Sequence, residues 1–220
     1  MRTTIRHDTT ARHVRKYESQ NPVQRWLLGR FHRTVRGWID DVRPARVLDF
    51  GCGEGYFWQA MARLGPLPEV VGLDVRQDAV DAASARVPGA TFLCRDLFDL
   101  DPAAERFDLV VASETLEHLY EPVPVLEQLC RLSRGHLLLT VPREPFFQLS
   151  NLLRGRDVRR LGNHPEHVQR WSRNGFVRFV SPLVAVERVD TSFPFTLVLG
   201  RPRAGGSGPV VNAPVAPDAG

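Results

Sequence analysis

The chain has 220 residues, of which 43% are hydrophobic and 25% are charged, and its formal net charge is +4. This length and composition are typical of one globular domain with a substantial core. No run of about 18 apolar residues is present to span a bilayer, and the first residues lack the apolar core of a signal peptide. We therefore expect a cytoplasmic protein without a transmembrane segment. Cys52, Cys94 and Cys130 are too few and too scattered for a disulfide framework or a zinc cluster, and we expect them to be reduced core thiols.

The charge is distributed unevenly along the chain. Residues 1–46 carry a net charge of +7, residues 47–150 carry −8, and residues 151–180 carry +5. The plainer interpretation is a solvated, arginine-rich surface. The alternative is that the basic flanks face an anionic partner, such as a phosphate-bearing substrate, RNA or a lipid surface.

A basic amphipathic helix is predicted near the N-terminus. Asn21 and Pro22 form a helix cap followed by proline at the first helical position. Arginines alternate with apolar residues that recur at helical spacing: Val23, Trp26, Leu27, Phe31, Val35, Trp38 and Ile39. We expect this helix to pack on the domain core, while peripheral contact with a membrane stays open.

The centre of the chain alternates short apolar runs with helical segments, as in an α/β protein. Helices are predicted at 56–64, 77–87 and 122–132, and strands at 46–50, 70–75, 91–94, 107–112 and 135–141. This alternation predicts a Rossmann-like, mostly parallel sheet with helices on both faces.

The alternation of strands and helices stops after the fifth predicted strand. Residues 142–170 contain two prolines, an apolar stretch and a basic run, and we interpret them as an inserted lid. Ser172 is then expected to cap a short helix that ends near Val180. Two apolar runs at 183–189 and 193–199 predict a closing antiparallel hairpin, which makes the sheet seven-stranded.

These elements predict three parts. Residues 1–45 form an N-terminal cap that contains the basic helix, and residues 46–201 form the main domain with the lid inserted at about 142–170. Residues 202–220 are rich in glycine, proline, alanine and serine, and we expect them to be a disordered tail.

A glycine-rich loop, Gly51-Cys52-Gly53-Glu54-Gly55, follows the first predicted strand. In α/β sheets, ligands bind at the carboxyl ends of the strands, and glycines there allow positive φ and close approach of the backbone. A dinucleotide fingerprint would need glycine where Tyr56 stands. Asp49 also argues against a pyrophosphate at this loop, because its carboxylate would repel it. A zwitterionic ligand with an ammonium group suits the loop better.

The loop and three further motifs resemble those of class I S-adenosylmethionine-dependent methyltransferases. The first motif of that family is an acidic residue followed by G-x-G-x-G, which matches Asp49 to Gly55 here. Val70–Asp74 resembles the second strand of that family, and Phe107–Ser113 resembles the fourth. Arg95–Leu97, after the third predicted strand, resembles the adenine site. The resemblance covers about residues 46–141, and it implies the Rossmann-like methyltransferase fold for the main domain.

The resemblance also implies roles for individual residues in binding S-adenosylmethionine (SAM). Asp74 would accept both ribose hydroxyls, and Asp96 would accept from the exocyclic amine of adenine. The backbone N–H of Leu97 would meet a ring nitrogen, and Ser113 and Glu114 would lie beside the methionine portion. The full expected set is Asp49, Gly51, Cys52, Gly53, Gly55, Asp74, Val75, Asp96, Leu97 and Ser113.

The acceptor half of the site is expected in the segment after the fourth strand. Glu114, Glu117 and His118 would share one face if a helical turn starts there, and two carboxylates with an imidazole suit a divalent ion. The E-x-x-E-H pattern resembles the ubiquinone-pathway O-methyltransferases and the small-RNA 3′-end 2′-O-methyltransferases. In both groups these residues are associated with magnesium or another divalent metal. His167, four residues before Trp171, would complete the site as in the RNA group.

A site without metal is the favoured alternative, because Glu-His-Leu after the fourth strand recurs in small-molecule methyltransferases that need none. His167 is then the first choice as general base, followed by His118 and His164. Glu114 would act beside them.

Three hypotheses for the function follow. The leading one is O-methylation of a small apolar or ring-containing acceptor, with Phe146, Phe147 and Leu149 lining the lid or serving as ordinary helix packing. The second is a metal-dependent RNA 2′-O-methyltransferase, which is less favoured because the sequence shows no RNA-binding module. The third is a cofactor-binding protein without catalysis. The oligomeric state is not determined by the sequence.

Overall fold

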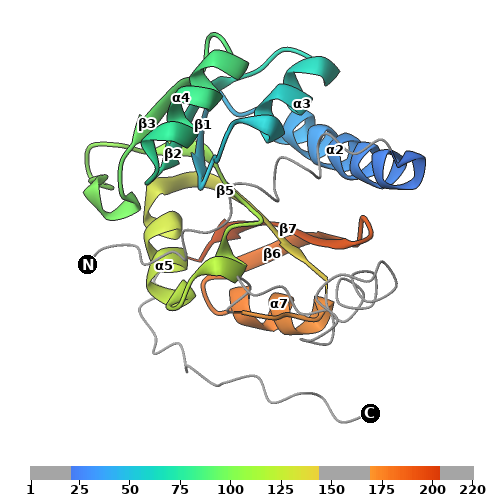
Figure 1. The fold of residues 1–220 in the computed structure, drawn as a ribbon. Helices are drawn as coiled ribbons and strands as arrows, with labels where there is room; N and C mark the ends of the chain where they lie inside the picture. Colours follow the sequence, from blue (N-terminus) through green and yellow to red (C-terminus); the bar gives the residue numbers. More distant parts are fainter. Residues whose placement is uncertain (1–20, 144–168, 204–220) are drawn as a thin grey trace.

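A computed structural model describes residues 21–143 and 169–203. In these ranges the chain forms one sheet in the order β3-β2-β1-β4-β5-β7-β6 (Figure 1). The first five strands along the chain pair in parallel, and β7 is antiparallel to both of its neighbours. The strands are β1 (Arg46–Phe50), β2 (Glu69–Asp74), β3 (Thr91–Cys94), β4 (Phe107–Ser113), β5 (Ser133–Pro142), β6 (Val184–Asp190) and β7 (Phe195–Pro202). The predicted seven-stranded sheet with its closing hairpin is confirmed.

Helices cover both faces of this sheet, as predicted. Figure 1 shows α2, α3 and α4 gathered on one side and α5 and α7 on the other. The helices are α2 (Pro22–Val42), α3 (Tyr56–Leu64), α4 (Gln77–Arg86), α5 (Pro122–Leu132) and α7 (Arg173–Val180), with short 3₁₀ turns η1 (Leu97–Asp99) and η2 (Leu116–His118). Because strands buried on both faces need apolar side chains on both, the central strands are almost continuously hydrophobic.

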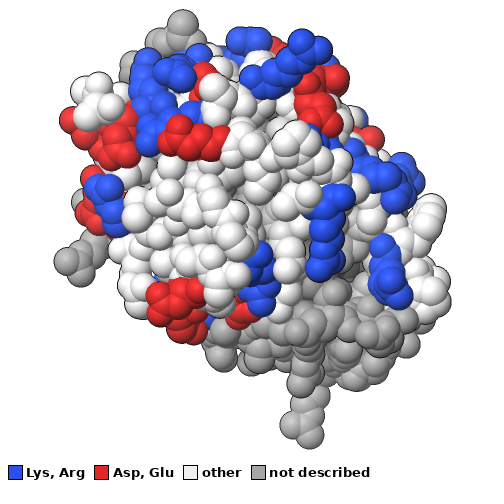
Figure 2. Space-filling view, turned by 90° about the horizontal axis from the view of Figure 1, so that it is seen from above, with Lys and Arg blue, Asp and Glu red and all other residues white. Residues whose placement is uncertain are grey.

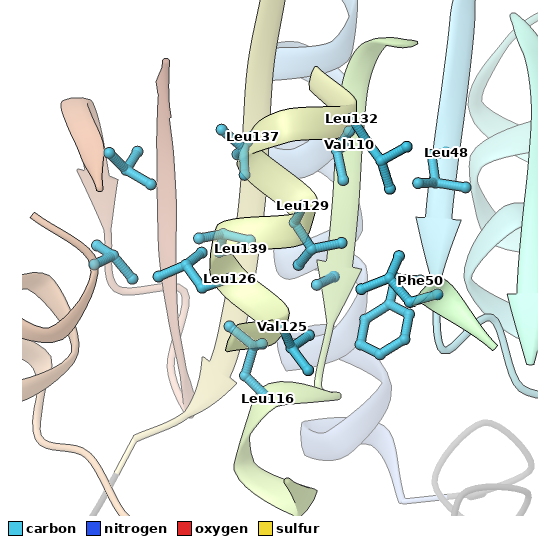
Figure 3. Close-up of a cluster of buried hydrophobic side chains, with 14 of the residues drawn as sticks. Leu48, Phe50, Val110, Leu116, Val125, Leu126, Leu129, Leu132, Leu137 and Leu139 are labelled. Carbon is cyan, nitrogen blue, oxygen red and sulfur yellow. The ribbon is translucent and has the colours of Figure 1, made fainter. Parts of the chain in front are cut away.

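The core on the α5 side shows how the helix spacing produces this layer. Leu126, Leu129 and Leu132 recur at every third position, so they share the face of α5 that lies on the sheet (Figure 3). They pack on Leu137 and Val110 of β5 and β4, and all five side chains are fully buried.

The N-terminal helix is capped as predicted, but its apolar stripe is buried only in part. Oδ1 of Asn21 accepts hydrogen bonds from the backbone N–H of Val23 at 2.9 Å and of Gln24 at 3.3 Å. Val23 and Trp26 are 63% and 58% exposed, in contrast to the prediction that they pack on the core. The buried residues of α2 begin one turn later, at Phe31, because the sheet and α3 are covered only by the later part of this 21-residue helix.

Three sequence-based details need correction. Cys94 is exposed rather than a core thiol, because it ends β3, an edge strand with a neighbour on one side only. The strand predicted at 135–141 begins at Ser133, and the last strand begins at Phe195 instead of residue 193. The later start of β7 follows from a turn in which the N–H of Phe195 donates to the carbonyl of Ser192.

The predicted lid and tail lie mostly outside the described residues. Of the lid region 142–170, residues 144–168 are not described, and these include Phe146, Phe147, Leu149, His164 and His167. Of the tail, 204–220 are not described. None of the helices within 21–143 and 169–203 is both long and apolar enough to cross a lipid bilayer.

Asp108 joins the start of β1 to β4 and β5, and this predicts a pH-dependent contribution to stability. Its Oδ2 accepts from the backbone N–H of Ala45 at 3.0 Å and of Arg46 at 2.9 Å, and its Oδ1 accepts from Nε of Arg134 at 2.7 Å. The hydrogen bond from Arg134, followed by those from the backbone amides, lowers the pKa of Asp108 below its ordinary value. A carboxyl with a lowered pKa in the folded state stabilises it above the unfolded pKa and loses that effect as pH falls.

We therefore expect Asp108→Asn to lower the free energy of unfolding at pH 7 by about 1–2 kcal/mol. The difference from wild type should shrink as the pH falls below about 4, the ordinary pKa of aspartate. Urea unfolding between pH 3 and pH 7 measures both. Glu69→Gln is the matched control, because the exposed Glu69 pairs with Arg46 at the surface and should contribute less than about 0.5 kcal/mol. A constant difference at all pH values would contradict the prediction.

Candidate cofactor and acceptor site

The glycine loop lies where β1 and β2 end, at the edge shared by the carboxyl ends of the parallel strands. The N–H groups of Gly51 and Cys52 both donate to the carbonyl of Leu73 at 2.9 Å, which ties the loop to the end of β2. Gly51, Gly53 and Gly55 have φ values of 75°, 51° and 77°. Residues that carry a Cβ rarely adopt these positive φ values, so the alternating glycines are needed to turn the chain from β1 into α3.

The three glycines differ in what surrounds them. A Cβ at Gly51 would lie 2.5 Å from Cγ2 of Thr115, and one at Gly55 would lie 3.0 Å from Cβ of Ala83 in α4. A Cβ at Gly53 would meet nothing within 4 Å. The loop is therefore packed at both ends and open at its middle, which is the side where a ligand can approach the backbone.

Asp74, predicted to bind the ribose, lies against the open part of the loop. Its Oδ2 accepts from the N–H of Gly53 at 3.0 Å, and its Oδ1 accepts from the N–H of Arg76 at 3.0 Å. Nε of Arg76 lies 3.8 Å from the same Oδ1. A carboxylate has about four acceptor positions, so the donors of the described residues leave two of them for a ligand.

Asp49, the other acid of the loop motif, is buried beneath it. Only 2% of its surface is exposed, and its Oδ2 accepts from Nε1 of Trp58 in α3 at 2.8 Å. Burial raises the pKa of Asp49 to about 7; the Trp58 hydrogen bond opposes this rise, and the charge of Asp74 adds to it. Sequence reasoning missed Trp58, because an aromatic residue on the inner face of a helix is typical of plain core packing.

The side chain of Cys52 is buried within the glycine loop. The side chain is 8% exposed, and burial together with the charges of Asp49 and Asp74 raises the pKa of its thiol well above the ordinary value. The group therefore stays protonated at neutral pH and is a poor nucleophile.

The predicted adenine segment follows β3 at the same edge. Oδ1 of Asp96 accepts from the N–H of Phe98 at 3.0 Å, and Asp99 accepts in return from the N–H of Asp96, so η1 begins with a reciprocal cap. The N–H of Arg95 donates to the carbonyl of Asp74 at 3.1 Å, which holds this segment beside the ribose candidate and Val75. The side chain of Leu97 is fully buried.

Hydrogen bonds from the hydroxyl groups of Ser113, Thr115 and Thr140 fix the end of β4 against its neighbours. Oγ of Ser113 lies 3.0 Å from Oγ1 of Thr140 on β5. Oγ1 of Thr115 donates to the carbonyls of Phe50 and Ser113, each at 3.2 Å, and so bridges the ends of β1 and β4. Neither threonine was predicted, because Phe50 is far from Thr115 in the sequence and Ser113 is far from Thr140.

The helical turn expected to begin at Glu114 begins later, which changes the acceptor half. Glu114 has a positive φ of 55°, its N–H donates to the carbonyl of Thr140 at 2.9 Å, and η2 includes only Leu116 to His118. Glu114 therefore does not share a helical face with Glu117 and His118, contrary to the prediction. Glu117 and His118 are 2% and 5% exposed, with Oε1 and Nε2 3.9 Å apart.

The described part of the chain does not fit a resident metal. Within 21–143 and 169–203, no group of three or more histidine, cysteine, aspartate or glutamate side chains is arranged to hold an ion. The set of Glu114, Glu117 and His118 is thus not assembled there, and His167 lies outside the described residues.

The strand order, the antiparallel β7 and the glycine loop between β1 and α3 define the fold of class I SAM-dependent methyltransferases. A family model described as a methyltransferase domain matches residues 22–180, and the chain belongs to this family.

Relatives by sequence include proteins named ubiquinone biosynthesis O-methyltransferase. The protein from Bradyrhizobium diazoefficiens is 31% identical over 116 residues, which are 51% of this chain and 44% of the relative. That from Coxiella burnetii is 26% identical over 158 residues, 63% of this chain and 66% of the relative. The chain thus spans less than half of the first relative and about two thirds of the second. Magnesium protoporphyrin IX methyltransferase from Synechocystis PCC 6803, solved with S-adenosylhomocysteine (SAH), has a TM-score of 0.64 at 17% identity, over 88% of this chain and 96% of that one. This similarity shows that the two chains share the same fold.

Proposed function

We propose that this chain transfers a methyl group from SAM to an oxygen atom of a small apolar or ring-containing acceptor. The observation that carries the proposal is the glycine loop, which is packed at Gly51 and Gly55, open at Gly53, and flanked by Asp49 and Asp74. When bound, SAM supplies an electrophilic methyl group on a sulfonium.

Each part of the cofactor has a matching group at this edge of the sheet. The two free acceptor positions of Asp74 suit the two ribose hydroxyls. Asp96 and the backbone N–H of Leu97 suit the adenine, and Asp49 suits the ammonium group of the methionine portion, which passes Ser113. Four strand ends converge here because the strands are parallel, so these groups lie at one edge.

The acceptor half needs a base that removes the proton of the attacking hydroxyl as the new O–CH₃ bond forms. We assign this role to His167, with His118 as the second choice and Glu114 beside them. The N–H of Gln169 donates to the carbonyl of Glu117 at 3.0 Å. His167 precedes Gln169 by two residues in the sequence, and this short separation along the chain supports the assignment.

Two observations support the proposed type of acceptor: the names of the relatives and the distribution of charge on the surface. Both relatives are named for ubiquinone biosynthesis, which favours a ring-bearing small molecule. Figure 2 shows basic and acidic side chains side by side around the rim of the face seen from above, and a largely uncharged middle. On this face, the mixed charges support RNA less well than a single basic stripe would. An oxygen of a small molecule is therefore the acceptor we propose.

The cofactor half is tested by calorimetric titration with SAH. We expect wild type to bind, and Asp74→Ala to weaken binding about a hundredfold, because two hydrogen bonds to a charged group are lost. Asp81→Ala is the control, since Asp81 is exposed on α4 and accepts from Nε2 of Gln77, and it should bind as wild type does. Wild type that binds no SAH would overturn the proposal. Binding without methyl incorporation into any hydroxylated acceptor or RNA would favour a non-catalytic binding protein.

A further inference from the structure

The buried carboxylate of Asp49 has no cation beside it in the described part of the chain. On β2 the nearest ionisable group is Asp74, which is also acidic, and on the loop it is the protonated thiol of Cys52. On β4, the residue opposite Asp49 is Val111, and on α3 it is the neutral indole of Trp58. Arg76 is engaged with Asp74 and Asp78. A buried carboxylate in such surroundings is costly to ionise.

Trp58 offsets part of that cost in a specific geometry. The indole is fully buried, and its ring packs edge-on against Phe57, with centroids 5.2 Å apart. Because the ring is confined in this way, its N–H is directed at Oδ2 of Asp49, 2.8 Å away. A hydrogen bond to the charged form of a carboxyl group favours ionisation and limits the rotation of the carboxylate.

We propose that Trp58 is a positioning residue for the cofactor: it holds Asp49 ionised and oriented toward the ammonium group of the methionine portion of SAM. The inference rests on the proposed function. Binding of the ammonium supplies the missing positive charge, so that association is linked to the loss of a proton from Asp49. Affinity therefore falls as Asp49 becomes protonated.

The pH dependence follows from linkage. Because the pKa of Asp49 is raised to about 7 in the absence of a ligand, SAH should bind tightly above that pH. Below it, the affinity should fall by about tenfold per pH unit, as for one linked proton. Trp58→Phe removes the N–H and keeps most of the ring. In this variant the affinity for SAH should begin to fall at a higher pH than in wild type. At pH 8.5 its affinity should be nearly that of wild type.

The test is a titration with SAH between pH 5.5 and 8.5 for wild type, Trp58→Phe and Asp49→Asn. We expect Asp49→Asn to bind weakly and without pH dependence over this range. A parallel titration of wild type with 5′-methylthioadenosine, which carries the adenosine and thioether but no ammonium group, should also show none. If Trp58 has only a structural role, Trp58→Phe will lose the same factor at every pH, and the proposal is wrong.

A measurement on wild type alone keeps the test decisive if Trp58→Phe does not fold. Calorimetry of SAH binding at pH 7 in phosphate and in Tris, which differ in ionisation enthalpy, should show net release of protons, because the raised pKa of Asp49 leaves part of this carboxyl group protonated before SAH binds. SAH binding without proton release would overturn this inference and leave the proposed function standing. Absence of SAH binding at every pH would overturn the proposed function instead.

Discussion

Replacement of Gly51 by alanine is expected to weaken SAH binding at least a hundredfold and to destabilise the fold by roughly 2–4 kcal/mol. Two effects add. The residue has a φ of 75°, where a Cβ is strained, and that Cβ would lie 2.5 Å from Cγ2 and 2.6 Å from Oγ1 of Thr115. Thr115 cannot move aside without losing its bonds to the carbonyls of Phe50 and Ser113, which join β1 to β4. Urea unfolding and SAH calorimetry measure the two outcomes.

Two variants separate these effects. Gly89→Ala carries a similar strain, with φ of 95°, but its Cβ would meet nothing within 4 Å. It should cost about 1 kcal/mol and leave SAH binding unchanged. The double variant Gly51→Ala with Thr115→Ala removes the two closest atoms, Cγ2 and Oγ1, so it should be more stable than the sum of the single changes predicts. Gly51→Ala with SAH affinity within threefold of wild type would contradict the packing argument.

Replacement of His167 by alanine is expected to lower kcat by about 10²- to 10⁴-fold, the range for loss of a general base. The affinity for SAH should stay within twofold, because this residue is assigned to the acceptor half alone. His118→Ala is the comparison: since His118 is buried beside Glu117, its loss should lower stability as well as rate. Rate measurements with saturating SAM, together with SAH titration, distinguish the two variants. An unchanged kcat for His167→Ala would transfer the role of base to His118.

Treatment with a chelator is an independent test of the acceptor half of the site. Because the described residues do not assemble a metal site, wild-type activity is expected to survive EDTA. A loss of activity that magnesium or manganese restores would instead support the set of Glu114, Glu117, His118 and His167.

The strand and helix pattern could be predicted because it depends on local periodicity. Apolar runs between turn residues predicted every strand within two residues at its start, and side-chain caps marked the beginnings of α2 and α7. The glycine loop could also be located, since the positive φ of Gly51, Gly53 and Gly55 is a property that few other residues tolerate. The acids Asp49 and Asp74 follow from their position at the ends of predicted strands.

The contacts that organise the site could not be predicted, because they join distant residues. Trp58 to Asp49, Thr115 to Gly51 and Thr140 to Ser113 depend on how α3, β4 and β5 pack together. The backbone of Glu114 likewise depends on a bond to the carbonyl of Thr140, and this bond removed it from the predicted helical face.

By itself, then, the sequence determined the class of fold, the position of the cofactor loop and the acids that flank it, because periodicity, glycine conformation and side-chain charge are local properties. Only the tertiary structure decided which side of the loop is open, how Asp49 is held, and that Glu114 stands apart from Glu117 and His118. These features arise from packing between elements, which no spacing along one chain records.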